Sequence, residues 1–250
     1  MKTRKRFGQH FLHDPGVLQR IVEAIDPTPG DAIVEIGPGE GALTRPLIER
    51  IGHLTAIEID RDLAAGLAQE FSSERLTVVS ADVLDFDFSV LPSRLRIVGN
   101  LPYNISTPIL FHLANYAGQV RDMHFMLQRE VVQRMVAKHS TPDYGRLSVM
   151  LQTRFNMHKL FNVAPGAFRP PPKVESAVVR LVPIAAQPDW DQAVLEKIVR
   201  EAFSARRKTL RNALPLEPAD YEELGIDPKL RPENLSPADY LRITRRVCAR

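Results

Sequence analysis

Four residues at the end of an apolar run combine hydrogen-bond acceptors with an aromatic ring. Residues 95–98 predict a short buried strand, and after Gly99 the chain continues with Asn100, Leu101, Pro102 and Tyr103. The Asn100 amide oxygen and the Leu101 carbonyl oxygen could accept the two hydrogens of the exocyclic amine of adenine. Such acceptors would draw this conjugated amine toward tetrahedral geometry and free its lone pair to attack an electrophilic methyl group. Pro102 stiffens the turn, and Tyr103 offers a face on which the base stacks.

Three glycines at alternate positions follow an earlier predicted strand, residues 32–36. They are Gly37, Gly39 and Gly41. Glycines in such a turn let the backbone approach a ligand closely. The spacing differs from the G-x-G-x-x-G of dinucleotide binders, and Glu35 and Glu40 beside the turn would repel a pyrophosphate. The two carboxylates suit a ligand that carries cationic groups and no phosphate. S-adenosylmethionine, with an ammonium and a sulfonium, is such a ligand.

Two further acids stand at the ends of the next predicted strands. Glu58 lies 17 residues past Gly41, near the position at which an acid holds ribose hydroxyls in doubly wound folds. Asp82 follows residues 76–79, where it could accept a hydrogen bond from an adenine amino group. One acid at a strand end is most simply a solvated loop residue. Three consecutive strand ends with fitting groups favour a nucleoside pocket.

The elements that must position these residues alternate along the chain. Strands are predicted at 32–36, 54–59, 76–79, 97–98 and 124–127. Helical patterns separate them, the first over 17–25 with Asp14 as its cap, so we expect an α/β fold with a parallel sheet wound on both sides. Two further β-rich runs, 148–155 and 174–181, are joined by a long loop without a clear helix. They predict an antiparallel hairpin at the sheet edge.

The pattern changes after Val182. Residues 183–188 form a predicted linker, and only helical patterns lie beyond it. These patterns cover 190–203, 206–214, 218–224 and 237–247. We therefore expect two domains, with the sheet and a basic N-terminal arm in residues 1–183 and a small all-helical domain in residues 189–250.

Basic residues form two clusters, although the net charge is only +3. One cluster is the N-terminal arm with Arg4, Lys5 and Arg6, and the other is Arg206, Arg207, Lys208 and Arg211. On the helix predicted over 206–214, the last three residues of the second cluster would share one face. Both clusters are compatible with contacts to RNA phosphates. For either cluster alone, a solvated surface is the simpler interpretation.

Composition narrows the class of protein. The chain has 250 residues, 44% of them hydrophobic, which is enough to bury a core. Its single cysteine, Cys248, excludes a disulfide framework and a cysteine-based metal site, and we expect no metal. No run of 18 apolar residues occurs, and no signal-peptide core follows the basic N-terminus. We expect a cytoplasmic protein that does not bind a membrane.

In combination, the motifs resemble those of the small-subunit (16S) ribosomal RNA adenine N6,N6-dimethyltransferase family. The resemblance covers nearly the whole chain and is carried by residues 7–12 (FGQHFL), 35–39 (EIGPG), 100–104 (NLPYN), 144–148 (YGRLS), 168–174 (FRPPPKV) and 206–211 (RRKTLR). It implies a Rossmann-like class I S-adenosylmethionine-dependent methyltransferase domain followed by a small helical domain. The implied substrate is a pair of adjacent adenosines in a hairpin loop near the 3′ end of 16S rRNA. Each adenosine would be methylated twice, within the 30S subunit or its precursor.

The resemblance also implies roles for individual residues. Those expected at the cofactor are His10, Leu12, Gly37, Gly39, Glu58 (ribose), Asp82 (adenine) and Asn100. The target base would lie between the rings of Tyr103 and Phe168, beside Leu101 and Pro102. The two basic clusters would contact RNA. At position 10 this chain has His where the family has Asn at least as often, and an imidazole can donate a similar hydrogen bond.

Three alternatives remain open from the sequence. A 23S rRNA adenine methyltransferase of the macrolide-resistance type shares the fold and the first motifs, but the 206–214 stretch and the residues after 235 argue against it. A DNA adenine methyltransferase shares the N-x-P-Y logic but would usually carry a larger recognition domain. A non-catalytic ribosome-assembly binder would have no use for Glu58, Asp82 and Asn100 together. We expect a monomer, and a role in subunit assembly can coexist with catalysis.

Overall fold

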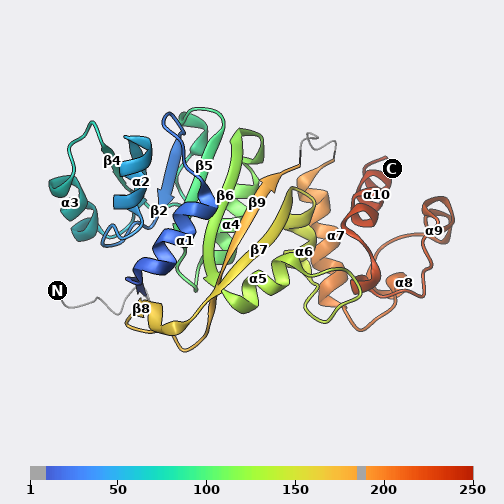
Figure 1. Ribbon diagram of the computed structural model, residues 1–250. Helices are drawn as coiled ribbons and strands as arrows, with labels where there is room; N and C mark the ends of the chain where they lie inside the picture. Colours follow the sequence, from blue (N-terminus) through green and yellow to red (C-terminus); the bar gives the residue numbers. More distant parts are fainter. Residues whose placement is uncertain (1–9, 185–189, 250) are drawn as a thin grey trace. The chain divides into compact units, whose positions relative to one another are not determined.

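A mixed seven-stranded sheet holds the first part of the chain together (Figure 1). The computed structural model describes residues 10–184 and 190–249. The strand order is β4-β3-β2-β5-β6-β9-β7. The strands are β2 (Ile33–Ile36), β3 (Leu54–Glu58), β4 (Leu76–Ser80), β5 (Leu95–Asn100), β6 (Val120–Gln128), β7 (Phe155–Val163) and β9 (Ser176–Pro183). The five strands from β4 to β6 are parallel, and β9 pairs antiparallel with β6.

The strand order reverses between β2 and β5. From β2 the chain proceeds outward to β3 and β4, and it then returns to place β5 on the other side of β2. In open α/β sheets, a crevice forms outside the carboxyl ends of the strands at such a reversal. The glycine turn follows β2, and Asn100 is the last residue of β5. The topology therefore brings the two predicted motifs to one crevice.

Local sequence signals account for the helices of this part. The carboxylates of Asp14 and Asp60 accept hydrogen bonds from first-turn amides of α1 (Pro15–Ile25) and α3 (Arg61–Glu70). Apolar side chains of both helices and of α2 (Thr44–Ile51) form a buried core with one face of the sheet, which presents Leu54, Val98 and Met126. Helices α4 (Ser106–Ala114) and α5 (Arg129–Val136) complete the alternation of strands and helices. The structure confirms the α/β fold.

The edge of the sheet differs from the prediction. Residues 148–155 were expected as a strand, but most of them lie in the helix α6 (Arg146–Gln152), at whose start the Gly145 N–H donates to Ser148 Oγ at 3.0 Å. The strand β7 begins at Phe155, the last residue of the predicted strand, and continues to Val163 through the segment expected as a loop. A short apolar run such as 149–151 fits a buried helix as well as a strand, so its periodicity did not decide between them. Two short strands, β1 (Phe11–Leu12) and β8 (Phe168–Arg169), also pair antiparallel.

The chain divides into two compact units. The first contains the described part of Met1–Val132 with Met157–Pro183, and the second contains Gln133–Asn156 with the described part of Ile184–Arg250. The division after Pro183 agrees with the predicted boundary, but residues 133–156, expected in the first domain, group with the C-terminal helices. The reason is packing: α6 contacts α7 and α10 and buries Val149, Met150 and Leu151.

Most of the predicted linker, residues 185–188, lies outside the described residues. Among the described residues beyond it there are four α-helices. They are α7 (Gln192–Ser204), α8 (Leu210–Ala213), α9 (Pro218–Leu224) and α10 (Pro237–Cys248), the last capped by Ser236 as its S-P sequence predicts. Rings of Phe203 and Tyr240 stack at 6.1 Å between centroids. The helix expected over 206–214 is reduced to α8, because residues 205–208 form a turn and Thr209 is extended. Arg207, Lys208 and Arg211 therefore do not share one helix face.

Short 3₁₀ segments connect several elements. They are Phe88–Val90, Ala117–Gln119, Pro165–Ala167 and Pro232–Asn234. Within the described ranges, the helices lack the combination of length and apolarity needed to cross a bilayer.

Candidate active site

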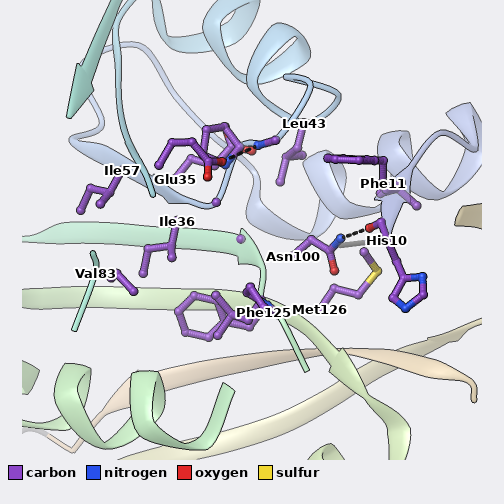
Figure 2. Close-up of a pocket in the computed structure, with 18 of the residues that line it drawn as sticks. His10, Phe11, Glu35, Ile36, Leu43, Ile57, Val83, Asn100, Phe125 and Met126 are labelled. Atoms are coloured by element: carbon purple, nitrogen blue, oxygen red, sulfur yellow. Dashed lines mark hydrogen bonds between the residues drawn. The ribbon is translucent and has the colours of Figure 1, made fainter. Parts of the chain in front are cut away.

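A cavity opens at the carboxyl ends of β2, β3, β5 and β6, where the sequence motifs meet (Figure 2). Of the predicted site residues, the lining includes His10, Leu12, Gly37, Gly39, Glu58, Asn100, Leu101, Pro102 and Tyr103. These residues come from segments up to 93 positions apart, His10 and Tyr103 being the extremes. The fold therefore assembles most of the predicted site in one place.

The glycine turn exposes backbone to this cavity. Gly37 and Gly39 have φ values of +65° and +59°, in the left-handed region that favours glycine. The turn is tied to the sheet because the Gly37 N–H donates to the Ile57 carbonyl at 2.9 Å. A Cβ added at Gly37 would meet no atom within 4 Å, so the space beside its backbone is open to a ligand. At Gly39 a Cβ would lie 3.0 Å from the ring of Phe11.

Glu58 supports the turn from the end of β3. One carboxylate oxygen accepts from the Gly39 N–H at 3.1 Å, and the other accepts from the Asp60 N–H at 2.9 Å. Burial raises the pKa of Glu58 above its usual value, and the two backbone hydrogen bonds oppose that rise. Glu58 is thus a fixed acceptor at the position where the sequence predicts a ribose contact.

Glu35 is a second buried carboxyl group at the same edge. It is 2% exposed, and the Thr44 hydroxyl donates to it at 2.7 Å. Burial raises the pKa of Glu35 to about 7; the Thr44 hydrogen bond opposes this rise, and the nearby Glu58 charge adds to it. A cationic group beside Glu35 would favour its ionised form, in agreement with the expected ammonium or sulfonium.

Asn100 is held at the crevice by the N-terminal segment. Its amide nitrogen donates to the main-chain oxygen of His10 at 2.9 Å, as the dashed line in Figure 2 shows. The amide oxygen has no hydrogen-bond partner among the described residues, so it can accept from a ligand. The preceding Gly99 allows this placement, since a Cβ there would lie 2.5 Å from the Ile36 oxygen. Sequence reasoning did not assign Gly99 a role, although a glycine directly before the amide was the available signal.

Tyr103 is fixed at its hydroxyl end. That hydroxyl lies 2.6 Å from Ser176 Oγ, at the start of β9. The Tyr103 and His10 rings lie 5.6 Å apart and are tilted by 30°. Burial raises the pKa of Tyr103, so its hydroxyl stays protonated and the side chain is neutral at physiological pH. Ser176 was missed because nothing in the sequence links it to residue 103.

Two of the residues predicted at the cofactor or the target base, Asp82 and Phe168, are not among those that line the cavity. Asp82 is partly buried in the loop after β4, where it accepts from the Leu84 N–H at 2.9 Å; its neighbours Ala81 and Val83 line the cavity instead. Phe168 is only 1% exposed and belongs to the core beneath β1, opposite Leu12. Its stacking role stays a prediction, and it would require Phe168 to become uncovered.

Apolar side chains form the remaining walls, and sequence reasoning did not identify them. They include Phe11, Ile36, Leu43, Ile57, Val83, Phe125 and Met126 (Figure 2). Nothing in the local sequence marks them, because their contact with the cavity depends on the assembled sheet. Groups of three or more His, Cys, Asp or Glu side chains able to hold a metal are absent from the described residues.

The predicted RNA contacts fall into three groups. Arg4, Lys5 and Arg6 lie outside the described residues. Arg207, Lys208 and Arg211 are exposed. Arg206 instead pairs with Glu233 at 3.4 Å and donates to the Pro142 carbonyl at 2.9 Å. Arg206 thus stabilises the turn that presents Arg207 and Lys208, and Arg211 follows in α8.

The fold and the site define a class I S-adenosylmethionine-dependent methyltransferase. The defining features are the order of the strands, the glycine turn after β2 and Glu58 at the end of β3. Two solved structures share this fold over nearly the whole chain. A dimethyladenosine transferase from Plasmodium falciparum matches with a TM-score of 0.84 and 26% identity, covering 96% of this chain and 98% of that one. The 23S rRNA methyltransferase ErmE matches with a TM-score of 0.72 and 29% identity, covering 95% and 99%.

The chain belongs to the ribosomal RNA adenine dimethylase family, whose model matches residues 1–248. It is 59% identical over 253 residues to the ribosomal RNA small subunit methyltransferase A of Aromatoleum aromaticum, covering 100% of this chain and 96% of the relative. The protein of the same name from Thiobacillus denitrificans is 59% identical over 251 residues, covering 99% and 98%. These matches confirm the family, the fold class and an S-adenosylmethionine-dependent rRNA adenine methyltransferase.

Proposed function

We propose that this chain dimethylates N6 of two adjacent adenosines in a hairpin loop near the 3′ end of 16S rRNA, within the 30S subunit or its precursor. The names of its relatives support the small subunit as the target. The observation that carries the chemistry is the orientation of Asn100, whose amide oxygen is free to accept. A neutral, anchored Tyr103 ring stands at the same cavity. The enzyme would act as a cytoplasmic monomer.

The residues of the cavity fit S-adenosylmethionine. Open space beside Gly37 accepts a ligand against the backbone, and the buried Glu35 and Glu58 supply acceptors for cationic and hydroxyl groups. We assign Glu58 to the ribose and the glycine turn to the methionine part. S-adenosylmethionine supplies an electrophilic methyl group on its sulfonium. His10 and Leu12 would cover the bound cofactor from the N-terminal segment.

Asn100 and Leu101 would prepare the target amine. In the first transfer, the Asn100 amide oxygen and the Leu101 carbonyl oxygen would accept one N6 hydrogen each, which directs the nitrogen lone pair at the methyl carbon. The N–C bond would form as the S–C bond breaks with its electron pair left on sulfur, and the methylated amine would then release one proton to water. The hydrogen bond to His10 fixes the amide so that its oxygen, and not its nitrogen, faces the amine. Asn100 therefore favours a target group that donates a hydrogen bond, such as an amine.

RNA recognition would combine a flipped base with phosphate contacts. Bases in hairpin loops are partly unstacked, which lowers the cost of moving one into a pocket. Tyr103 would stack on that base. Arg207, Lys208 and Arg211 are exposed and would neutralise phosphates, together with residues 4–6. Binding to immature subunits would also give the enzyme a role in assembly.

Transfer of labelled methyl groups to small subunits from cells that lack this enzyme tests the proposal. We expect label on two adjacent adenines near the 3′ end of 16S rRNA, with two methyl groups on each. Label on 23S rRNA in large subunits would support the macrolide-resistance type instead. Binding to immature subunits without any label would indicate a non-catalytic assembly factor.

A further inference from the structure

The target adenine presents more hydrogen-bonding groups than Asn100 and Leu101 engage. Those two residues supply acceptors for the N6 amine only. The ring nitrogens N1 and N7 lie on either side of that amine, and both are acceptors. A base that is held through its amine and stacked on Tyr103 can still rotate in its own plane. A hydrogen-bond donor to N1 or N7 would stop this rotation and keep the amine in line with the methyl group.

Several polar side chains of the cavity lack a donor for such a contact. Glu35, Glu40 and Glu58 line the cavity with carboxyl groups, which are acceptors when ionised. His124 also belongs to the lining, but both of its ring nitrogens are buried away from the cavity surface. These four residues therefore leave N1 and N7 without a partner.

Three further polar side chains of the lining have donors that are already engaged. The Asn100 amide nitrogen donates to the main-chain oxygen of His10 at 2.9 Å. The Tyr103 hydroxyl lies 2.6 Å from Ser176 Oγ. His10 Nδ1 lies 2.7 Å from the Pro170 carbonyl oxygen, which can only accept. In the neutral imidazole, Nδ1 therefore carries the proton and Nε2 is an acceptor.

Asn104 is the remaining polar side chain among the described residues that line the cavity. It is exposed, so a ligand in the cavity can reach it, and its amide makes no hydrogen bond to another described residue. The turn around it is fixed, because the Ile105 N–H donates to the Pro102 carbonyl at 3.2 Å and Ser106 Oγ donates to the Tyr103 carbonyl at 3.3 Å. The Asn104 amide nitrogen is thus an uncommitted donor on an ordered turn.

We infer that Asn104 binds the target adenine, with its amide nitrogen donating to one of the ring nitrogens that flank the amine, N1 or N7. This inference rests on the proposed function, since it takes the base to be the methylated adenosine. The position of Asn104 favours the base over the cofactor. It directly follows Tyr103, in the segment that also supplies the two oxygens for the amine, whereas Glu58 and the glycine turn come from β3 and β2.

Substrate analogues test which ring nitrogen is bound. In 1-deazaadenine and 7-deazaadenine, a C–H group replaces N1 or N7 and the amine is kept. Small subunits are reconstituted with 16S rRNA whose synthetic 3′ segment carries adenine or one analogue at a target position. Single-turnover methylation at that position is measured for the wild type and for Asn104→Ala. The ratio of the two proteins on each base cancels the intrinsic reactivity of the analogue.

We expect Asn104→Ala to methylate adenine about fivefold more slowly than the wild type, as for the loss of one hydrogen bond. On one of the two analogues the wild type and the variant should react at the same rate, because the partner nitrogen is already missing. On the other analogue the fivefold difference should persist. The analogue that removes the difference identifies the ring nitrogen.

Two more variants separate hydrogen bonding from structural effects. Asn104→Asp keeps the size of the side chain but places an acceptor against the ring nitrogen, so it should methylate adenine more slowly than Asn104→Ala. Asn162→Ala is the matched control, because Asn162 is an exposed asparagine of β7 outside the cavity lining. It should react like the wild type. Cofactor affinity and the thermal midpoint should be unchanged in both Asn104 variants.

Several results would overturn the inference. A fivefold difference between the wild type and Asn104→Ala on all three bases would show that the amide contacts neither N1 nor N7. Weaker S-adenosylmethionine binding by Asn104→Ala would place the amide at the cofactor instead. Wild-type rates in both Asn104 variants would mean that another group, such as a main-chain amide, fixes the base. If the wild type leaves unmodified adenine unmethylated, the proposed function fails; if it methylates adenine and the variants match it, only the assignment of Asn104 fails.

Discussion

The Asn100 amide nitrogen donates to the main-chain oxygen of His10 at 2.9 Å, and this contact ties the N-terminal segment to the end of β5. The acceptor is backbone, so the contact does not depend on the side chain at position 10. The presence of His rather than Asn at position 10 therefore leaves the orientation of Asn100 intact. The His10 ring is held separately, with Nδ1 2.7 Å from the Pro170 carbonyl oxygen.

Removal of the Glu58 carboxylate should weaken cofactor binding. Glu58→Ala deletes the expected ribose acceptor and also leaves the Gly39 N–H without its partner. We expect a loss of about 1.5–3 kcal/mol in the binding free energy of S-adenosylmethionine, the scale for hydrogen bonds to a charged group. Isothermal titration calorimetry measures this loss, and Glu58→Gln, which keeps one acceptor, should lose less. Unchanged affinity in Glu58→Ala would show that the ribose lies elsewhere.

Ser176→Ala should impair catalysis through Tyr103. The variant breaks the 2.6 Å contact between the two hydroxyls and frees the ring. We expect kcat/KM for small subunits to fall three- to tenfold, about 1 kcal/mol, with cofactor affinity unchanged. Tyr103→Phe removes the same hydrogen bond but keeps the stacking face. The double variant should therefore be no worse than either single variant, and additive losses would mean that the two residues act independently.

Glu35 should make the free enzyme less stable at neutral than at acidic pH. Its folded-state pKa of about 7 exceeds the value of 4.5 for an exposed glutamate, so the folded state holds the extra proton. This contribution to stability is present below pH 4.5 and is lost as the pH rises through 7. Glu35→Gln should be more stable than the wild type at pH 8, by about 3 kcal/mol at most, and show no gain at pH 4.

Denaturant unfolding of both proteins across pH 4–8 measures this difference. The comparison at each pH is needed because burial lowers the pKa of His124 to about 4, which makes stability fall as the pH drops through the same window. Because both proteins contain His124, its contribution cancels in the difference between their free energies of unfolding. Equal pH profiles for the wild type and Glu35→Gln would contradict a buried, proton-binding Glu35. The variant should also bind S-adenosylmethionine less tightly, through loss of the anion.

Replacing Arg207, Lys208 and Arg211 with Gln should weaken binding to small subunits and flatten its salt dependence. The slope of log K against log salt should fall by about 2–3 units if each residue neutralises one phosphate. Cofactor affinity should not change, because the cavity is built from residues of the other unit. An unchanged slope would remove these residues from the RNA interface.

Arg206→Gln provides the matched comparison. Arg206 contacts Glu233 and the Pro142 carbonyl within its own unit. Its replacement should lower the thermal midpoint more than the triple substitution does. If Arg206→Gln lowered the slope of log K against log salt by as much as the loss of one phosphate contact does, Arg206 would instead lie at the RNA.

Features with a local cause were predictable from the sequence. The helix caps Asp14, Asp60 and Ser236 act within their own turns, and each was expected or lies where a helix start was expected. Glu58 and Asn100 could be placed at strand ends because apolar runs precede them. Parallel strands then carry such residues to one edge without further information.

Features that depend on distant contacts were not predictable. The strand β7 is an edge strand with several exposed residues, so it lacks a strong apolar signal. Gly99 matters because Ile36 lies against it, and Ser176 matters because Tyr103 reaches it. The shortened α8 is likewise tied by the Leu210 N–H, which donates to the Leu230 carbonyl at 2.8 Å. None of these partners is close in sequence.

The most direct test of the catalytic account is single-turnover methyl transfer by Asn100→Ala with saturating S-adenosylmethionine and small subunits, alongside calorimetric affinity for the cofactor. The account predicts that transfer slows by about 10²-fold or more, the scale for loss of one preorganised hydrogen bond in a transition state. Cofactor affinity should weaken by a smaller factor, since the amide oxygen acts mainly on the reacting amine. Transfer at a near wild-type rate would contradict the assignment of Asn100 as the acceptor that orients the amine.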